Sequence, residues 1–384
     1  MAGSVRLGHL FGIPVAIHFT WLIAAGLVTA TLSLAIFPFD RPGMSAPVYW
    51  LIGSTASALF FSSVVAHELC HALVARHLGI PVRGITLFVF GGVSTIAREA
   101  RKPMHELLIA SAGPACSLAL FFTLFVLQRL MQPHWALGSR VVFYLSLANL
   151  FFTLFNLIPA LPLDGGRALR AAIWYVTGSF KLATKIAALM GHLLGFALIG
   201  FALYTVAVHA EWVQGGLLIL LGWFVHSAAE MAQQNALDRD LTAGVTLADV
   251  PKSKVAFVAP ETPLQNLIYD HLLAEDSAPS VLAVMRRRSL LGIITAKEIR
   301  RVPSIHWSHT QAQDVLVESS PQAFLAPATP LEEALEYMEV ERLGYVVVAN
   351  GEEEHLEAVS YNDMVQFLHR KREELRKGMA VEHP

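Results

Sequence analysis

The stretch at residues 61–78 reads FSSVVAHELCHALVARHL and contains the pattern H-E-x-x-H. On a helix, His67 and His71 lie one turn apart and share a face. Two imidazoles on one face can hold a Zn²⁺ ion, and Glu68 then stands beside the metal, where it can take a proton from bound water. The alternative interpretation is a chance match in the core helix of a soluble protein.

The apolar surroundings of the motif argue against a chance match. Between Tyr49 and Leu78 the only charged residues are Glu68 and Arg76. An acidic side chain in an apolar helix of membrane length costs about 2.5–3.5 kcal/mol on insertion scales. Such a residue indicates a functional site, so the segment favours a metal centre inside a membrane.

The 384-residue chain divides into an apolar and a polar part. Hydrophobic residues make up 54% of it and the mean hydropathy is +0.51, which is too apolar for an ordinary soluble protein. Of 58 charged residues, 23 lie in residues 1–240 and 35 in residues 241–384. The first five-eighths therefore resembles a membrane protein, and the formal net charge of −2 gives no reason to expect a nucleic-acid partner.

Six apolar segments approach the roughly 20 residues that are needed to cross a bilayer. They lie at residues 13–37, 49–78, 104–130, 141–159, 184–208 and 213–231. No cleavable signal pattern precedes the first segment, which we therefore expect to remain as an anchor.

The basic residues predict how these spans are oriented. One set of connections holds ten Lys and Arg residues and the other holds three. Because basic loops stay in the cytoplasm, the N-terminus and the C-terminal third are both predicted to be cytoplasmic. The expected location is the cell membrane, and His67 and His71 lie toward the cytoplasmic end of the second span.

A short segment after the second span predicts a β-hairpin. Residues 82–98 read VRGITLFVFGGVSTIAR, in which β-branched and aromatic residues flank Gly91 and Gly92. A hairpin next to the metal helix could offer its edge to an extended peptide, which makes Gly91 and Gly92 candidate substrate-binding residues. The alternative is an ordinary interfacial loop with a flexible glycine pair.

The end of the fourth span supplies a third candidate metal ligand. Residues 156–167 read NLIPALPLDGGR, and the two prolines end the helix just before Asp164. Asp164 is thus predicted at the depth of the two histidines, and two His plus one carboxylate leave the fourth position for water. Alone, Asp164 could equally be a turn residue. Asn156 could donate to a developing oxyanion or bond to a neighbouring helix.

The other polar or small residues of the spans are interpreted as structural. Gly113 and Pro114 suit close helix packing and a kink. His18, His192 and His209 are expected to bond between helices or lie at an interface, although a minor role near the site stays open for His18. The two cysteines, Cys70 and Cys116, are expected to be unpaired.

The C-terminal third contains an internal repeat. The sequence APETPL at residues 259–264 matches APATPL at residues 326–331, 67 positions later. Each repeat closes with a strand that enters a helix, at residues 292–298 and 357–363. In both, a hydroxyl stands three residues before a carboxylate, which is also a helix-capping pattern.

Taken together, residues 13 to about 170 resemble the site-2 protease family of intramembrane zinc metalloproteases. The resemblance rests on the H-E-x-x-H motif in a transmembrane helix, the glycine hairpin, and the motif from Asn156 to Gly165. It implies one Zn²⁺ per chain, held by His67, His71 and Asp164, with Glu68 as the catalytic base. It also implies cleavage of transmembrane or membrane-inserted substrates in regulated intramembrane proteolysis.

Residues from about 245 to 368 look like a tandem pair of CBS domains, which commonly bind ATP, ADP or AMP and often form homodimers. This resemblance implies nucleotide contacts from Thr295 with Glu298 and from Ser360 with Asp363. The chain departs from the usual pattern at Glu357, where glycine is common, and at Glu298, where aspartate is common.

The predicted fold is a polytopic α-helical membrane protein with about six transmembrane helices and a membrane-associated β-hairpin, followed by a soluble α/β tandem CBS module. The expected domains are a transmembrane metalloprotease domain at 1–235, a linker at 236–245, CBS domains at about 246–305 and 310–370, and a charged tail at 371–384. The expected function is that of a zinc-dependent intramembrane endopeptidase regulated by adenine nucleotides. The alternative is a CBS-regulated membrane transporter or channel with a polar metal site.

Overall fold

The chain consists of two compact units, Met1–Ala236 and Leu237–Pro384, which are described separately. The computed structural model describes residues 3–89, 91–96, 100–242, 244–272, 281–286, 289–318, 324–341, 343–349 and 356–381. The last three residues of the predicted charged tail lie outside these ranges.

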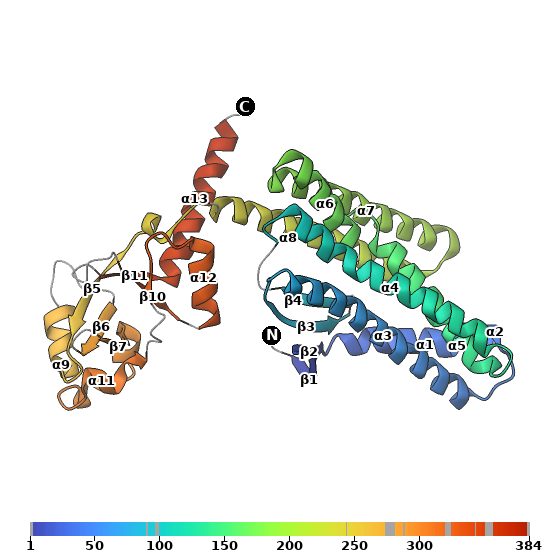
Figure 1. Cartoon of the computed structure of the whole chain (residues 1–384), viewed down its shortest axis with the longest axis horizontal. Coiled ribbons are helices and arrows are strands. Elements are labelled where there is room, and N and C mark those ends of the chain that lie inside the picture. The colour runs from blue at the N-terminus through green and yellow to red at the C-terminus, as the bar shows by residue number, and fades with distance from the viewer. Residues whose placement is uncertain are drawn as a thin grey trace. The chain divides into compact units, whose positions relative to one another are not determined.

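The first unit is built from long apolar helices (Figure 1). Within the described residues, six helical segments are long and apolar enough to cross a membrane, so the chain is a multi-pass membrane protein. The first joins α1 (Trp21–Thr31), a π-helical turn and α2 (Phe37–Asp40). The others are α3 (Ala46–His77), α4 (Pro103–Met131), α5 (Ala136–Asn156), α7 (Phe180–His209) and α8 (Trp212–Thr242). A shorter helix, α6 (Asp164–Thr177), lies between α5 and α7 in the chain.

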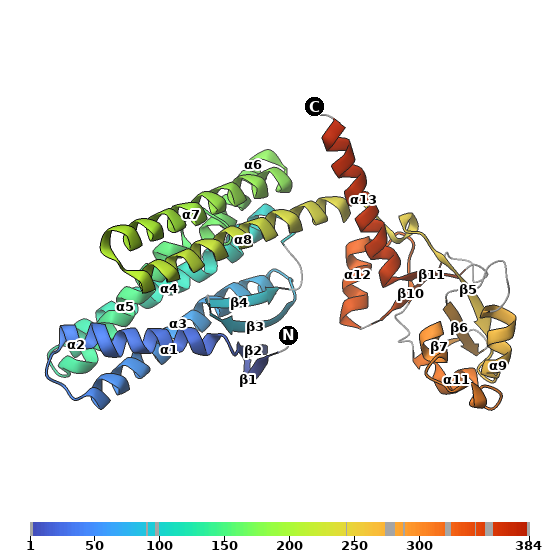
Figure 2. The ribbon, with the colours of Figure 1, turned by 180° about the vertical axis from the view of Figure 1, so that it is seen from behind.

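A four-stranded sheet packs beside α3 (Figures 1 and 2). Its order is β1 (Ser4–Leu10), β2 (Ile13–His18), β3 (Val82–Phe88) and β4 (Gly91–Ile96), with β2 and β3 parallel and the other pairs antiparallel. Ile13, Val15 and Ile85 are buried against Ala72 of α3. The apolar face of the sheet thus covers the helix that carries the H-E-x-x-H motif.

The prediction that the first span begins at Ile13 is wrong, because residues 13–18 form β2. Ile13, Val15 and Ile17 alternate with Pro14 and Ala16, which is the period of a strand. A tight turn with positive φ at Phe11 and Gly12 sends β2 back along β1. Apolar content alone therefore did not separate this strand from the helix that follows it.

The predicted hairpin is confirmed, and the loop alternative is excluded. Phe88 pairs with Gly91 and Leu87 pairs with Gly92, so the connection consists of residues 89 and 90. The glycines therefore do not form the turn, as the sequence had suggested, but begin β4, the edge strand of the sheet. A glycine has no Cβ, and this lets β4 approach α3 closely.

The division between the two units, after Ala236, falls at the start of the predicted linker at residues 236–245. Most of this linker is helical, since α8 continues to Thr242. The segment AQQNALDRDLT contains good helix formers such as Ala, Gln, Leu and Arg.

The second unit repeats one pattern twice. The first half contains β5 (Ser253–Val258), α9 (Leu264–Leu267), β6 (Val281–Arg286), β7 (Ser289–Ile294) and α10 (Ala296–Ile299). The second contains β9 (Phe324–Leu325), α12 (Leu331–Val340), β10 (Tyr345–Ala349), β11 (Leu356–Ser360) and α13 (Tyr361–Val381). In each half a parallel strand pair is followed by an antiparallel pair.

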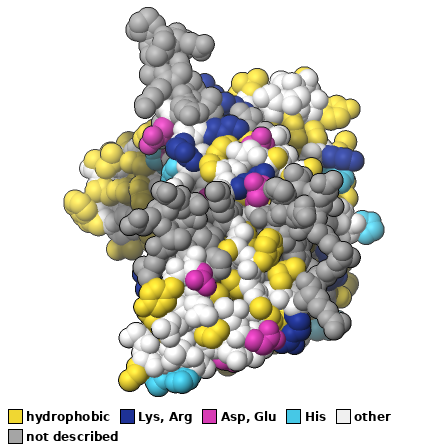
Figure 3. Space-filling model, turned by 90° about the vertical axis from the view of Figure 1, so that its left-hand side faces the viewer, with side chains coloured by type: hydrophobic (Ala, Val, Ile, Leu, Met, Phe, Trp, Pro, Cys, Tyr) yellow, Lys and Arg dark blue, Asp and Glu magenta, His cyan; other side chains and the backbone are white. Residues whose placement is uncertain are grey.

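One seven-stranded sheet joins the halves in the order β8-β7-β6-β5-β11-β10-β9, where β8 is Val317–Glu318. The two cores do not follow the predicted boundaries. Leu247 and Val250, on and after a 3₁₀ turn at Leu247–Asp249, pack in the core of the second half. Ala312 of α11 (Ala312–Val315) packs in the core of the first. The face in Figure 3 carries side chains of both charge signs among apolar and uncharged ones.

Candidate metal centre

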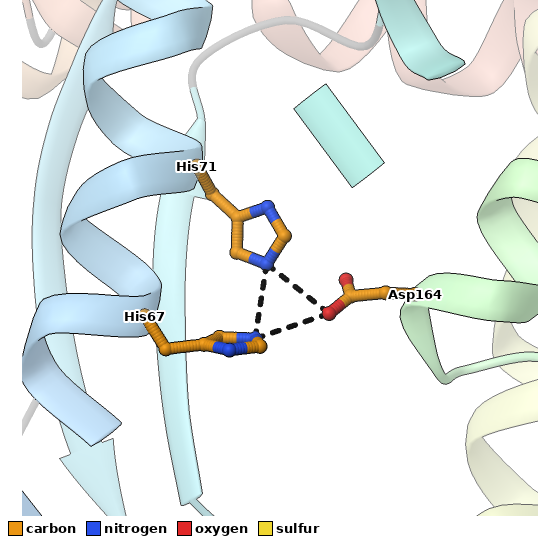
Figure 4. A group of neighbouring side chains, drawn as sticks. All are labelled: His67, His71 and Asp164. Carbon is orange, nitrogen blue, oxygen red and sulfur yellow. Dashed lines mark hydrogen bonds and ion pairs between the residues drawn. The ribbon is translucent and has the colours of Figure 1, made fainter. Parts of the chain in front are cut away.

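Three side chains meet between α3 and the start of α6 (Figure 4). His67 Nε2 lies 3.1 Å and His71 Nε2 lies 3.2 Å from the same oxygen, Oδ2 of Asp164. The two Nε2 atoms are 3.2 Å apart, and all three residues are buried. Donors of this kind and number fit a zinc ion with a fourth position left for water.

The far nitrogens of both imidazoles are held by α4. His71 Nδ1 lies 2.6 Å from the carbonyl oxygen of Ile109, and His67 Nδ1 lies 2.9 Å from Ser117 Oγ. A carbonyl oxygen only accepts, so Nδ1 of His71 carries a proton, and its Nε2 is the nitrogen that can bind a metal. Nothing in the sequence pattern singled out Ser117, a buried hydroxyl in an apolar helix.

Gly113 leaves the space in front of these nitrogens open. A Cβ at this position would stand 2.2 Å from His71 Nε2 and 2.5 Å from His67 Nε2. The interpretation of Gly113 as a packing residue is therefore incomplete. Because glycine has no side chain, the backbone of α4 at Gly113 forms one wall of the site and leaves room in front of the two imidazoles. The signal for this role is visible only once α4 is placed against α3.

Asp164 is positioned by the chain around it. It is the first residue of α6, and the next two glycines pack on the preceding loop, where a Cβ at Gly165 would stand 2.3 Å from the carbonyl oxygen of Leu157. The loop is tied to α7 by a hydrogen bond from the Leu161 amide to the Ala187 carbonyl (3.2 Å). Arg167 Nη1 lies 3.9 Å from the other oxygen, Asp164 Oδ1. These contacts present the carboxylate to the histidines.

Glu68 lies beside the hairpin. A Cβ at Gly92 would stand 2.4 Å from Glu68 Cγ and 3.3 Å from Oε1, so β4 passes directly over this carboxylate. Gly91 has φ of +128°, and nothing lies within 4 Å of a Cβ built at this position. The structure thus brings the edge strand of the sheet to the acid of the H-E-x-x-H motif.

The remaining polar residues of the spans lie in other surroundings. Asn156 Nδ2 donates to the Phe152 carbonyl of its own helix (3.0 Å). His18 pairs with Thr20 (2.8 Å), and His192 pairs with His226 of α8 (3.0 Å). Both cysteines are free thiols.

In the second unit, the predicted nucleotide residues cap helices. The amide of Thr295 donates to Glu298 Oε2 (3.1 Å), and the amide of Ser360 donates to Asp363 Oδ2 (3.2 Å). Burial, followed by the negative charges of Asp363 and then Glu298, raises the pKa of the Tyr345 hydroxyl above its usual range. One carboxylate from each repeat therefore acts electrostatically on the same tyrosine.

Glu357, the departure from the CBS pattern, lies 2.6 Å from Lys252 Nζ through its Oε2 and so belongs to an ion pair.

Comparison with known proteins gives the family of the chain. The profile of Peptidase family M50 matches residues 55–137 and 131–200. Rip3 of Mycobacterium tuberculosis, which is named as a zinc metalloprotease, is 33% identical over 347 residues, or 88% of this chain and 86% of Rip3. The chain belongs to peptidase family M50. This M50 protease is also 30% identical over 349 residues to a protein of Synechocystis that is named as a zinc metalloprotease, with 91% of each chain covered.

Two solved structures are similar to parts of this M50 protease. The site-2 protease from Methanocaldococcus jannaschii is 29% identical, covers 60% of this chain and 95% of its own, and gives a TM-score of 0.42. The CBS domain NE2398 is 18% identical, covers 30% of this chain and 87% of its own, and gives a TM-score of 0.25. The chain is thus a membrane metalloprotease of a zinc-dependent family, and the transporter or channel alternative is wrong.

Proposed function

We propose that His67, His71 and Asp164 hold the zinc ion of this protease and that Glu68 is its general base. The observation that carries the ligand assignment is the convergence of two Nε2 atoms on one carboxylate oxygen, each within 3.2 Å. A zinc ion held there supplies a Lewis acid and lowers the pKa of a bound water toward about 7.

Glu68 supplies the proton transfer. It follows His67 in the chain and is only partly buried, and it is not one of the three converging ligands. We assign its carboxylate the place next to the metal. Its carboxylate takes a proton from the attacking water and later delivers it to the nitrogen of the leaving amine. Asn156 is proposed to stabilise the developing oxyanion with its second amide N–H, since the first bonds to Phe152.

The substrate is proposed to be a transmembrane or membrane-inserted protein that is cleaved in regulated intramembrane proteolysis. A helical segment has its backbone amides paired and must unwind before hydrolysis. The edge strand β4, which passes over Glu68 at Gly92, offers backbone groups to an extended segment. We therefore assign substrate binding to the backbone at Gly91 and Gly92.

The proposed orientation places both chain ends in the cytoplasm, since ten of thirteen Lys and Arg residues in the connections lie on that side. We propose that a membrane protease domain is followed by tandem CBS domains. Homodimerisation through the CBS domains stays a prediction.

Cleavage of a transmembrane peptide by the purified protein in detergent tests this function and its strand-binding step together. We expect one zinc per chain and cleavage of the peptide. In a bound strand, alternate backbone amides point to the same edge. N-methylation of the substrate residues whose amides pair with β4 is therefore expected to raise KM by about tenfold, because one or two hydrogen bonds to β4 are lost. Methylation of the intervening residues is the matched control.

Equal KM values for the two methylated peptides would contradict strand addition. A protein without zinc after the metal is resupplied would contradict the ligand assignment itself.

We further infer that the second unit binds an adenine nucleotide between its repeats, at Thr295, Glu298, Ser360 and Asp363. The support is the equivalent placement of two hydroxyl–carboxylate pairs, whose carboxylates both act on Tyr345. Carboxylates at these places can accept hydrogen bonds from ribose hydroxyls. Nucleotide binding is proposed to change the cleavage rate, which requires two states with different nucleotide affinity.

Calorimetry of the full chain with ATP, ADP and AMP tests this inference. Asp363→Asn is expected to weaken binding by about tenfold, because a charge-assisted acceptor is lost. Asp249→Asn is the control, since Asp249 also caps a turn, with its Oδ2 2.8 Å from the Thr246 amide nitrogen, in the same unit. Wild-type affinity in Asp363→Asn, or no binding of any of the three nucleotides by the wild type, would refute the site.

A further inference from the structure

The two halves of the metal centre are carried by different helices. α4 holds the far nitrogens of both histidines through Ile109 and Ser117, and its Gly113 faces the near nitrogens. α6 carries Asp164. The two helices pack against each other, so a shift of one along the other would move Asp164 away from the histidines.

A buried ion pair joins these two helices. Arg170 of α6 donates from Nε to Glu106 Oε1 of α4 (2.8 Å), and a second N–H of the same guanidinium reaches the same oxygen. Arg170 is 7% exposed and Glu106 is 2% exposed. Glu106 Oε2 is also buried and has no hydrogen-bond partner among the described residues. Arg170 is therefore the principal compensation for the charge of Glu106.

The same guanidinium also contacts α7. Its central carbon lies 4.8 Å from the centre of the Phe180 ring, which packs edge-on against Trp174 of α6. Arginine suits both contacts, because its planar guanidinium can donate two N–H groups to Glu106 and lie flat on the Phe180 ring. A lysine ammonium is a single compact charge and has no such plane. One side chain thus fixes α6 against both α4 and α7.

We propose that Arg170 and Glu106 are positioning residues of the protease, which hold α4 and α6 in the register that brings Asp164 Oδ2 to both histidines. The inference rests on the proposed zinc ligands. Glu106 lies one helical turn before Ile109, and Arg170 lies six residues after Asp164, so the pair acts through the helices and touches no ligand. Metal sites need their groups held within about 0.5 Å, which a charged fork between rigid helices can provide.

The test removes both charges together, in the double variant Glu106→Gln/Arg170→Met, because removal of one alone leaves a buried, unpaired charge. Zinc affinity, measured by competition with a chelator, is expected to fall about 10- to 100-fold, the usual effect of losing an outer contact of a metal site. The visible absorption of the Co²⁺-loaded protein should shift as well, since it reports ligand geometry.

Arg140→Met is the matched control. Arg140 of α5 pairs with Asp40 of α2 at 3.6 Å, so it also joins two helices, but neither of them carries a proposed zinc ligand. We expect wild-type zinc affinity and absorption from this variant.

Wild-type affinity and an unchanged cobalt spectrum in the folded double variant would overturn the proposal. If the double variant does not fold, Arg170→Lys tests the proposal instead. This variant keeps the positive charge but loses the planar pair of N–H donors. The proposal then requires weaker zinc binding, and wild-type binding refutes it. A wild-type protein that binds no zinc would instead refute the ligand assignment.

Discussion

Glu68→Gln is expected to lower the rate of peptide cleavage by about 10²- to 10⁴-fold, which is the usual contribution of a positioned general base. Zinc should remain at one per chain, because Glu68 is not among the three residues whose donor atoms converge. Glutamine has nearly the shape of glutamate, so the fit beneath Gly92 is preserved while the proton acceptor is lost.

Cleavage of a transmembrane peptide and metal content are measured on the same preparations. Glu230→Gln is the control, since Glu230 is an acidic residue of α8 whose side chain is 53% exposed, and it should leave both values unchanged.

Gly92→Val should also abolish cleavage while zinc is retained. The valine side chain would displace Glu68, because the flexible side chain of Glu68 moves more easily than the backbone of the strand. Cleavage at the wild-type rate by Glu68→Gln would exclude this residue as the base.

Gly113→Ala is expected to abolish zinc binding and, with it, cleavage. Its Cβ would stand 2.2 Å and 2.5 Å from the two Nε2 atoms, where zinc itself would lie at about 2.0–2.1 Å from each nitrogen. The histidines cannot easily turn away, since Ile109 and Ser117 of the same helix hold their other nitrogens. The added methyl group and the metal therefore compete for one space.

Zinc per chain, measured after dialysis against a zinc-buffered solution, should fall from about one to near zero. Gly200→Ala of α7 is the control, because nothing lies within 4 Å of its built Cβ. In a helix interior, alanine is favoured over glycine by about 1 kcal/mol, so this variant should be at least as stable as the wild type. Full zinc occupancy in Gly113→Ala would show that the metal lies elsewhere.

Much of this protein could be predicted from local patterns. His67 and His71 are one helical turn apart, with Glu68 directly after the first. The apolar segment around them is long enough to indicate both a helix and a membrane span. Asp164 could be proposed because prolines end a span just before it. In each case the signal is a short-range rule of spacing or length, which does not depend on how distant segments pack.

The sequence misled where one pattern suited two structures. Residues 13–18 are as apolar as a span yet form a strand, and residues 236–242 are polar yet continue a helix. Likewise, sequence order assigns Leu247 to the first repeat and Ala312 to the second. Leu247 instead packs in the core of the second repeat, and Ala312 packs in the core of the first. Local composition does not say which distant surface buries a side chain.

The amino-acid sequence by itself predicted the candidate zinc ligands and the candidate base, and it determined the membrane character of the first unit. Tertiary structure alone decided that Gly92 lies on Glu68, that Gly113 leaves room in front of both imidazoles, and that Arg170 meets Glu106. The physical reason is that a missing side chain, a carbonyl oxygen or a buried charge acts through its distance to a partner. That distance exists only after helices far apart in the chain have packed together.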